Sequence, residues 1–124
     1  MSGLLLDSHV LIWYTDGDAR MSDADATMIR KAEYVYVSAA TVWELTIKMT
    51  LEKLPLRSVL DLAVEANCTL LPITPEHAQA IASLPRHHGD PFDHLLLAQA
   101  KVEGLTLVTH DEILARYGVP VLLV

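Results

Sequence analysis

Short apolar segments alternate along this chain with longer stretches in which apolar residues recur at helical spacing. The short segments are rich in Leu and Val, which pack well on a pleated and buried surface. They predict strands at residues 4–6, 35–37, 69–71, 105–108 and 121–123. The stretches between them predict helices at residues 8–14, 22–33, 38–51, 59–66, 75–82, 92–102 and 111–117.

Residues with strong positional preferences mark several ends of these elements. Ser22 and Ser38 are good N-caps because a serine hydroxyl can accept from a free amide of the first turn. Pro75 stands at a first-turn position, and Gly104 can end a helix in the left-handed conformation. Pro55 predicts a break between the third and fourth helices.

This alternation predicts an α/β fold with three layers: a mostly parallel five-stranded sheet with helices on both faces. Parallel strands need crossover connections, and the helices between the strands supply them. The length of 124 residues suits one domain, and no repeat or linker-like segment divides it. We therefore expect residues 1–124 to form a single domain whose ligand binds at the carboxyl ends of the strands.

Four carboxylates stand where such a sheet would bring them to that edge: Asp7, Glu44, Asp93 and Asp111. Asp7 directly follows the first strand, and Asp111 lies just beyond the fourth. Two carboxylates about 4 Å apart repel each other by roughly 4 kcal/mol at an effective dielectric constant near 20. A fold that gathers them needs a cation, and oxygen ligands favour Mg²⁺ or Mn²⁺. The sequence therefore predicts a metal-dependent enzyme that acts on a phosphate.

Three of these acids also have an ordinary structural interpretation. Asp7 and Asp111 could each cap the helix that follows. Glu44 could pair with Lys48 one turn later, a contact that contributes a few tenths of a kcal/mol. Glu44 has mostly apolar neighbours, however, and a charge in such surroundings needs a partner.

Asp90 and Asp93 compete for one role at the start of the helix at residues 92–102. Asp90 precedes Pro91 and is the natural N-cap of that helix. Asp93 is then free to face a metal ion, in a first turn where the helix dipole favours an anion. We assign the structural role to Asp90 and the functional role to Asp93.

Other polar and aromatic residues give weaker signals. A zinc site is disfavoured because the histidines show no HxxxH spacing and the chain has one cysteine. Ser8 and Thr109 could bind a phosphate oxygen or a metal-bound water, or could simply cap. Trp13 and Trp43 fit a core better than a surface for base stacking; an exposed tryptophan would suit a dimer or partner groove.

Charge and hydropathy bear on which partners the protein binds and where in the cell it acts. The net charge of −7 is unusual for a nucleic-acid binder, so any nucleic acid would be engaged locally through metal ions and a few basic groups. No apolar run approaches the roughly 18 residues of a membrane span, and Asp7 interrupts the first apolar segment, unlike a signal peptide. We expect a cytoplasmic protein without a membrane partner.

Four segments in order resemble PIN-domain proteins of the VapC toxin type. Together they span nearly the whole chain in the order found in the family, whereas a single motif among them would be weak support. They read LLLDSHVLIW at 4–13, VSAATVWELTIK at 37–48, DPFDHLLLAQA at 90–100, and LVTHD at 107–111 with YGVPV at 117–121.

The resemblance implies a Mg²⁺- or Mn²⁺-dependent endoribonuclease that is the toxin of a toxin–antitoxin pair. Its catalytic and metal-binding acids would be Asp7, Glu44, Asp93 and Asp111. It also implies an RNA substrate, a homodimer and a cognate antitoxin that blocks the active site. Ser8 stands where Thr is common, His94 where Arg is common, and His110 where the residue varies. The His94 departure removes one candidate phosphate contact.

Three alternatives remain from the residues alone. A phospho-acceptor signalling domain needs an acceptor Asp after its third strand, where this chain has Pro72-Ile73-Thr74. A non-catalytic module could use the acids only to attract a basic protein. A PIN nuclease could also act outside toxin–antitoxin systems.

Overall fold

The computed structural model describes residues 3–52 and 58–124, and the predicted break at Pro55 lies outside these residues. Five strands form one sheet: β1 (Leu4–Leu6), β2 (Val35–Ser38), β3 (Thr69–Leu71), β4 (Thr106–Thr109) and β5 (Val121–Leu123). The helices are α1 (Ser8–Asp16), α2 (Asp23–Lys31), α3 (Ala39–Leu51), α4 (Val59–Glu65), α5 (Pro75–Ala80) and α6 (Pro91–Glu103). The described residues also form two 3₁₀ helices, η1 (Ile81–Ser83) and η2 (Glu112–Tyr117).

The sheet has the strand order β3-β2-β1-β4-β5, and every strand pair within the described residues is parallel. The predicted α/β class is confirmed, and the sheet is parallel throughout where the sequence indicated a mostly parallel one. The chain builds outward from β1 to β3, then returns to the other side of β1 to place β4. The order of the strands therefore reverses between β1 and β4, which is where a parallel sheet commonly opens a binding crevice.

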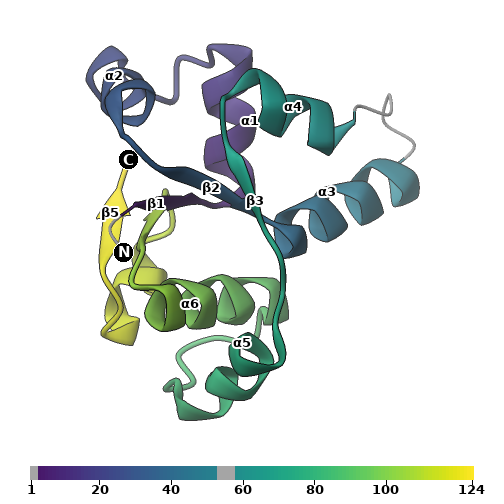
Figure 1. Ribbon diagram of the computed structural model, residues 1–124, viewed down its shortest axis with the longest axis vertical. Helices are drawn as coiled ribbons and strands as arrows, with labels where there is room; N and C mark the ends of the chain where they lie inside the picture. Colours follow the sequence, from purple (N-terminus) through teal and green to yellow (C-terminus); the bar gives the residue numbers. More distant parts are fainter. Residues whose placement is uncertain (1–2, 53–57) are drawn as a thin grey trace.

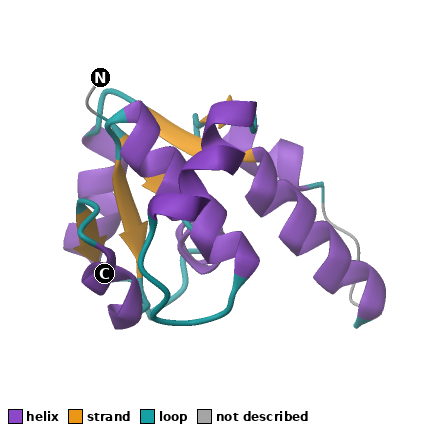
Figure 2. Ribbon diagram, turned by 90° about the horizontal axis from the view of Figure 1, so that it is seen from below, coloured by secondary structure: helices purple, strands orange, loops and turns teal. Residues whose placement is uncertain are grey.

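Helices cover the sheet on both faces (Figure 1), and a view turned by 90° shows them packed around the strands (Figure 2). Alternate residues of the central strands serve the two sides: Leu5 and Leu107 face one core, while Leu6 and Val108 face the other. This is the two-residue period of a strand that is buried on both faces.

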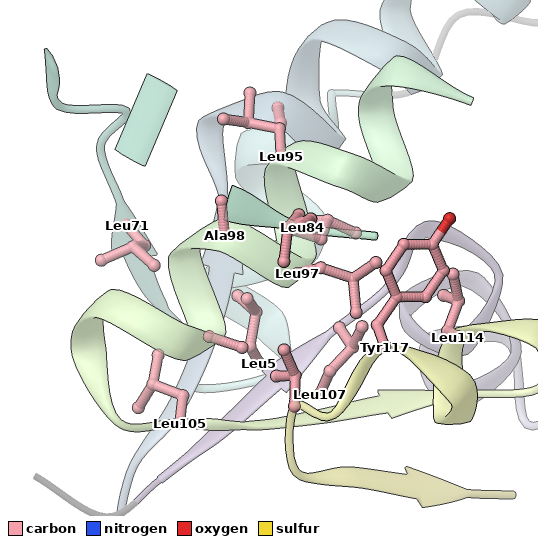
Figure 3. Close-up of a cluster of buried hydrophobic side chains, with 14 residues drawn as sticks. Leu5, Leu71, Leu84, Leu95, Leu97, Ala98, Leu105, Leu107, Leu114 and Tyr117 are labelled. Atoms are coloured by element: carbon pink, nitrogen blue, oxygen red, sulfur yellow. The ribbon is translucent and has the colours of Figure 1, made fainter. Parts of the chain in front are cut away.

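The first core lies between the sheet and α6 (Figure 3). Every residue of α6 from His94 to Ala100 is buried, so the middle of this helix is covered on all sides. The second core packs α1 to α4 against the opposite face, with Trp13 and Ile29 among its members. Helices of both layers therefore pack beside the carboxyl edge of the sheet and hold it in place.

The caps confirm several predicted helix ends. Ser22 and Ser38 accept from amides of the first turns of α2 and α3, and Gly104 ends α6 with a φ of 67°. The helix predicted at residues 75–82 is shorter, because α5 gives way to η1 at Ile81. The buried ring of His77 joins α5 to α6, with Nε2 2.9 Å from Oε1 of Glu103.

Candidate metal centre

A pocket of about 140 Å³ lies at the carboxyl edge of the sheet, beside the point where the strand order reverses. Residues just after β1 and β4, the first turn of α1, the helix α3 and the N-terminal end of α6 contribute its walls. The lining residues are Asp7, Ser8, His9, Glu44, Lys48, Asp90, Asp93 and Asp111. The pocket therefore brings together the four acids singled out from the sequence, with a fifth carboxylate from Asp90.

Asp7 is both the N-cap of α1 and a wall of the pocket. Its Oδ1 accepts from the amide of Val10 at 3.0 Å, and its Oδ2 accepts from the Thr109 hydroxyl. The residue is only 8% exposed. Burial raises the pKa of the Asp7 carboxyl, although the hydrogen bonds from Thr109 and Val10 act in the opposite direction. The sequence left capping and a place in the pocket as alternatives for Asp7, and its carboxylate has both.

Glu44 both pairs with Lys48 and lines the pocket. The hydroxyl of Ser8 donates to Oε1 of Glu44, and Nζ of Lys48 lies 3.6 Å from Oε2. The carboxylate side chain is 12% exposed, whereas that of Lys48 is 45% exposed. The partly solvated lysine offsets part of the charge of Glu44 and leaves the carboxylate directed at the pocket.

Asp90 caps α6, as the sequence predicted, and Asp93 lies beside it in the pocket lining. Oδ1 of Asp90 accepts from the amides of Phe92 at 2.9 Å and Asp93 at 3.3 Å, so Asp90 is the N-cap of α6. Asp93 lies in the first turn, with Oδ2 3.0 Å from Nε2 of His88. Burial raises the pKa of Asp93 to about 6; His88 opposes the rise, and the charges of Asp90 and Glu44 add to it.

Asp111 occupies the open edge of the pocket. It is exposed, and its Oδ1 accepts from the amide of Ile113 at 3.1 Å as the N-cap of η2. Its own amide donates to the hydroxyl of Thr109 at 3.1 Å. Thr109 thus links Asp111 to Asp7. The two acids line the pocket from just beyond the ends of the neighbouring strands β4 and β1.

Several neighbours of the pocket have roles that the sequence did not give them. Ser8 and Thr109 donate to Glu44 and Asp7, so their hydroxyls are engaged with the acids themselves. His88 was missed as a partner of Asp93, because nothing in local spacing shows how a loop residue folds back onto a helix. His9 lines the pocket and was also missed.

The two tryptophans differ in their surroundings. Trp13 is buried in the second core, as the sequence favoured, between the rings of His9 and His110. Trp43 is 58% exposed, so the prediction of a core position was wrong. Its ring makes an edge contact with Phe92, with ring centroids 4.9 Å apart. The reason is its place on α3: Glu44 and Leu45 turn inward, and Trp43 precedes them on the outer side of the helix.

The donor set of the pocket fits a hard divalent cation. All of its acidic groups are oxygen donors, and burial raises the pKa of both Asp7 and Asp93, so a positive charge between them would be stabilising. Among the described residues, no group of three or more His, Cys, Asp or Glu side chains stands close enough to form a ready-made metal cage. Mg²⁺ does not need one, because it commonly keeps several waters and takes only one or two carboxylates directly.

The sequence is similar to known proteins along most of its length. The PIN domain family matches residues 4–120. The chain is 34% identical to ribonuclease VapC22 of Mycobacterium tuberculosis over 125 aligned positions, which cover 97% of this chain and 95% of the relative.

Solved structures show the same fold at lower identity. VapBC2 of Rickettsia felis, bound to a DNA fragment from its promoter, superposes with a TM-score of 0.75 at 14% identity and 97% coverage of both chains. DNA-bound VapBC of Salmonella typhimurium gives a TM-score of 0.74 at 18% identity and 98% coverage of both. FitAB bound to the IR36 DNA fragment gives 0.64 at 24% identity, covering 96% of this chain and 93% of its own.

Proposed function

This chain belongs to the PIN-domain family, and from that premise we propose that it is a metal-dependent endoribonuclease, the toxin of a VapBC-type toxin–antitoxin pair. The observation that carries the proposal is the acidic pocket at the carboxyl edge of the sheet. RNA cleavage at this pocket needs a bound cation, because carboxylates without one would repel the phosphates of the RNA backbone. PIN nucleases of the VapC type generally depend on a divalent metal, and we propose Mg²⁺, with Mn²⁺ as a substitute.

In this proposal Asp7, Glu44 and Asp93 hold the cation, directly or through water, and Asp111 completes the site from its open edge. Bound Mg²⁺ or Mn²⁺ would lower the pKa of a water molecule and offset the negative charge of the scissile phosphate. The residues of the chain orient the acids that hold the cation. Thr109 and Ser8 fix the orientation of Asp7 and Glu44 by donating to them.

Two basic side chains at the pocket support the binding of an anionic substrate. Lys48 is partly exposed beside Glu44, and His9 is exposed at the pocket wall. They can face phosphates next to the scissile bond. This role matters because His94, which stands where Arg is common in the family, is buried in α6. The reaction is hydrolysis: water attacks phosphorus, the bond from phosphorus to one ribose oxygen breaks, and that oxygen leaves as a hydroxyl.

Apolar side chains exposed on α3, α4 and β3 support a protein partner. They include Trp43, Leu51, Leu60, Val64 and Leu70. An acidic protein with such a surface suits a cognate antitoxin and a second copy of the chain. No helix within the described ranges is both long and apolar enough to traverse a bilayer. We propose that the protein acts in the cytoplasm as a homodimer.

The test compares RNA cleavage by the wild type and by Asp93→Asn, each purified free of any partner and shown to be folded. Asp61→Asn is the matched control, because Asp61 is also the third residue of its helix but lies outside the pocket. We expect cleavage of a mixed RNA pool by the wild type and the control, and none by Asp93→Asn. Full activity of Asp93→Asn would overturn the site assignment.

A further inference from the structure

The loop between η1 and α6 carries adjacent histidines, and one of them bridges a pocket acid to the core. Nε2 of His88 lies 3.0 Å from Oδ2 of Asp93. The other ring nitrogen, Nδ1, is hydrogen-bonded to the hydroxyl of Tyr117. The side chain of His88 is only 18% exposed, so solvent has limited access to these two contacts.

Tyr117 is held firmly at its ring. The ring belongs to the first core beside Leu97 and Leu114, and its hydroxyl points away from the leucines (Figure 3). Both the His87 and the His88 backbone amides donate to that hydroxyl, each at 3.1 Å. A hydroxyl anchored in the core therefore holds the loop and the His88 ring together.

Counting donors and acceptors gives the direction of this chain of hydrogen bonds. A phenol oxygen accepts at two lone pairs and donates one hydrogen. The two loop amides occupy the lone pairs, so the O–H of Tyr117 donates to Nδ1 of His88. Nε2 of His88 then carries the ring hydrogen and donates to Asp93. The remaining neighbour, Nε2 of His94 at 3.2 Å, makes the longest contact to the hydroxyl.

We propose that Tyr117 and His88 are positioning residues that orient the Asp93 carboxylate for the divalent cation. The inference deepens the proposed function and depends on Asp93 being a metal ligand. Asp93 lies near the charges of Asp90 and Glu44, which would favour its turning away. A neutral imidazole that donates to Oδ2 holds the carboxylate in place and leaves Oδ1 available. Hydrogen bonds to a ligating carboxylate commonly change metal affinity by about 10- to 100-fold.

The test measures Mn²⁺ binding directly, from the electron paramagnetic resonance signal of free Mn²⁺. Wild type is compared with Tyr117→Phe, which removes only the hydroxyl, and with His88→Ala. His88→Gln is the conservative variant, because its amide can still donate to Asp93. His87→Ala is the matched control: His87 is exposed, and its ring touches Tyr117 edge-on without reaching Asp93.

We expect Tyr117→Phe and His88→Ala to weaken Mn²⁺ binding by about tenfold or more. His88→Gln should recover part of the loss, and His87→Ala should bind like wild type. The Mn²⁺ concentration for half-maximal RNA cleavage should rise in the same proportion, with an unchanged KM for RNA at saturating Mn²⁺. Circular dichroism checks folding, and His88→Ala keeps the test valid if Tyr117→Phe does not fold.

Equal Mn²⁺ affinity in folded wild type, Tyr117→Phe and His88→Ala would overturn the positioning role, as would a wild type that binds no Mn²⁺. The proposed nuclease function can be refuted independently of this positioning role. If the wild type binds Mn²⁺ and the variants bind it more weakly, but no RNA is cut, the positioning role stands and the nuclease proposal does not.

Discussion

The charge of Asp93 should destabilise the metal-free protein, and replacing it with Asn should reveal by how much. Burial raises the pKa of Asp93 to about 6 in the folded protein, against 3.8 for an unburied Asp. A pKa difference of about two units corresponds to about 3 kcal/mol. Because the side chain is 20% exposed and solvent screens part of its charge, we expect about 1 to 2 kcal/mol.

The sign follows from proton binding. Between about pH 4 and pH 6 the folded protein keeps a proton on Asp93 that the unfolded chain has lost, so the free energy of unfolding falls as pH rises. Above about pH 6 the loss is complete. The amide introduced by Asp93→Asn carries no charge at any of these pH values. The variant should therefore match wild type near pH 4 and exceed it by about 1 to 2 kcal/mol at pH 7.

Urea unfolding in EDTA, measured from pH 4 to pH 8, tests this difference. His88 is hydrogen-bonded to Asp93, so the comparison is repeated in a His88→Gln background. Asp61→Asn, at the same helix position outside the pocket, should show no such gain. If Asp93→Asn is less stable than wild type at pH 7, or equally stable at every pH, the charge of Asp93 does not destabilise the folded protein.

Three further predictions concern the neighbours of the pocket and the core. Thr109→Val removes the donor to Asp7 and leaves a buried carboxylate oxygen unpaired, so urea unfolding should show a loss of about 1 to 3 kcal/mol; an unchanged midpoint would contradict this. Lys48→Met breaks only a partly exposed pair, so the free energy of unfolding should change by less than about 0.5 kcal/mol, and a loss above about 1 kcal/mol would show that the pair is stronger than its geometry indicates. Leu97→Ala opens a cavity at a fully buried position of α6 and should cost about 2 to 5 kcal/mol in thermal or urea unfolding, whereas exposed Leu51→Ala should have little effect.

The acids of the pocket could be predicted because their positions follow from the order of strands and helices. Asp7 comes at the end of β1, and Asp111 follows β4, its neighbour in the sheet. The parallel arrangement then places both at one edge, without any knowledge of side-chain packing. Asp90 could be separated from Asp93 because an Asp before Pro at a helix start has a well-defined capping role.

The surroundings of the acids could not be predicted in the same way. The contact of His88 with Asp93 and Tyr117 depends on the path of the loop at residues 84–90, which is fixed by amides that donate to a core hydroxyl. The exposure of Trp43 depends on the rotation of α3 about its axis, and several neighbouring residues of that helix are apolar. Local patterns show neither feature, because both depend on how separate elements pack.

If the acidic pocket cuts RNA through a bound divalent cation, removing and restoring the metal should switch cleavage off and on. Folded wild type, purified free of a partner, is treated with EDTA, transferred to metal-free buffer and given a mixed RNA pool before and after Mg²⁺ is added. We expect no cleavage without metal, cleavage on addition of Mg²⁺ or Mn²⁺, and none by Asp7→Asn under either condition. Cleavage that persists without metal, or that survives in Asp7→Asn, would show that the pocket does not cut RNA through a cation held by these acids.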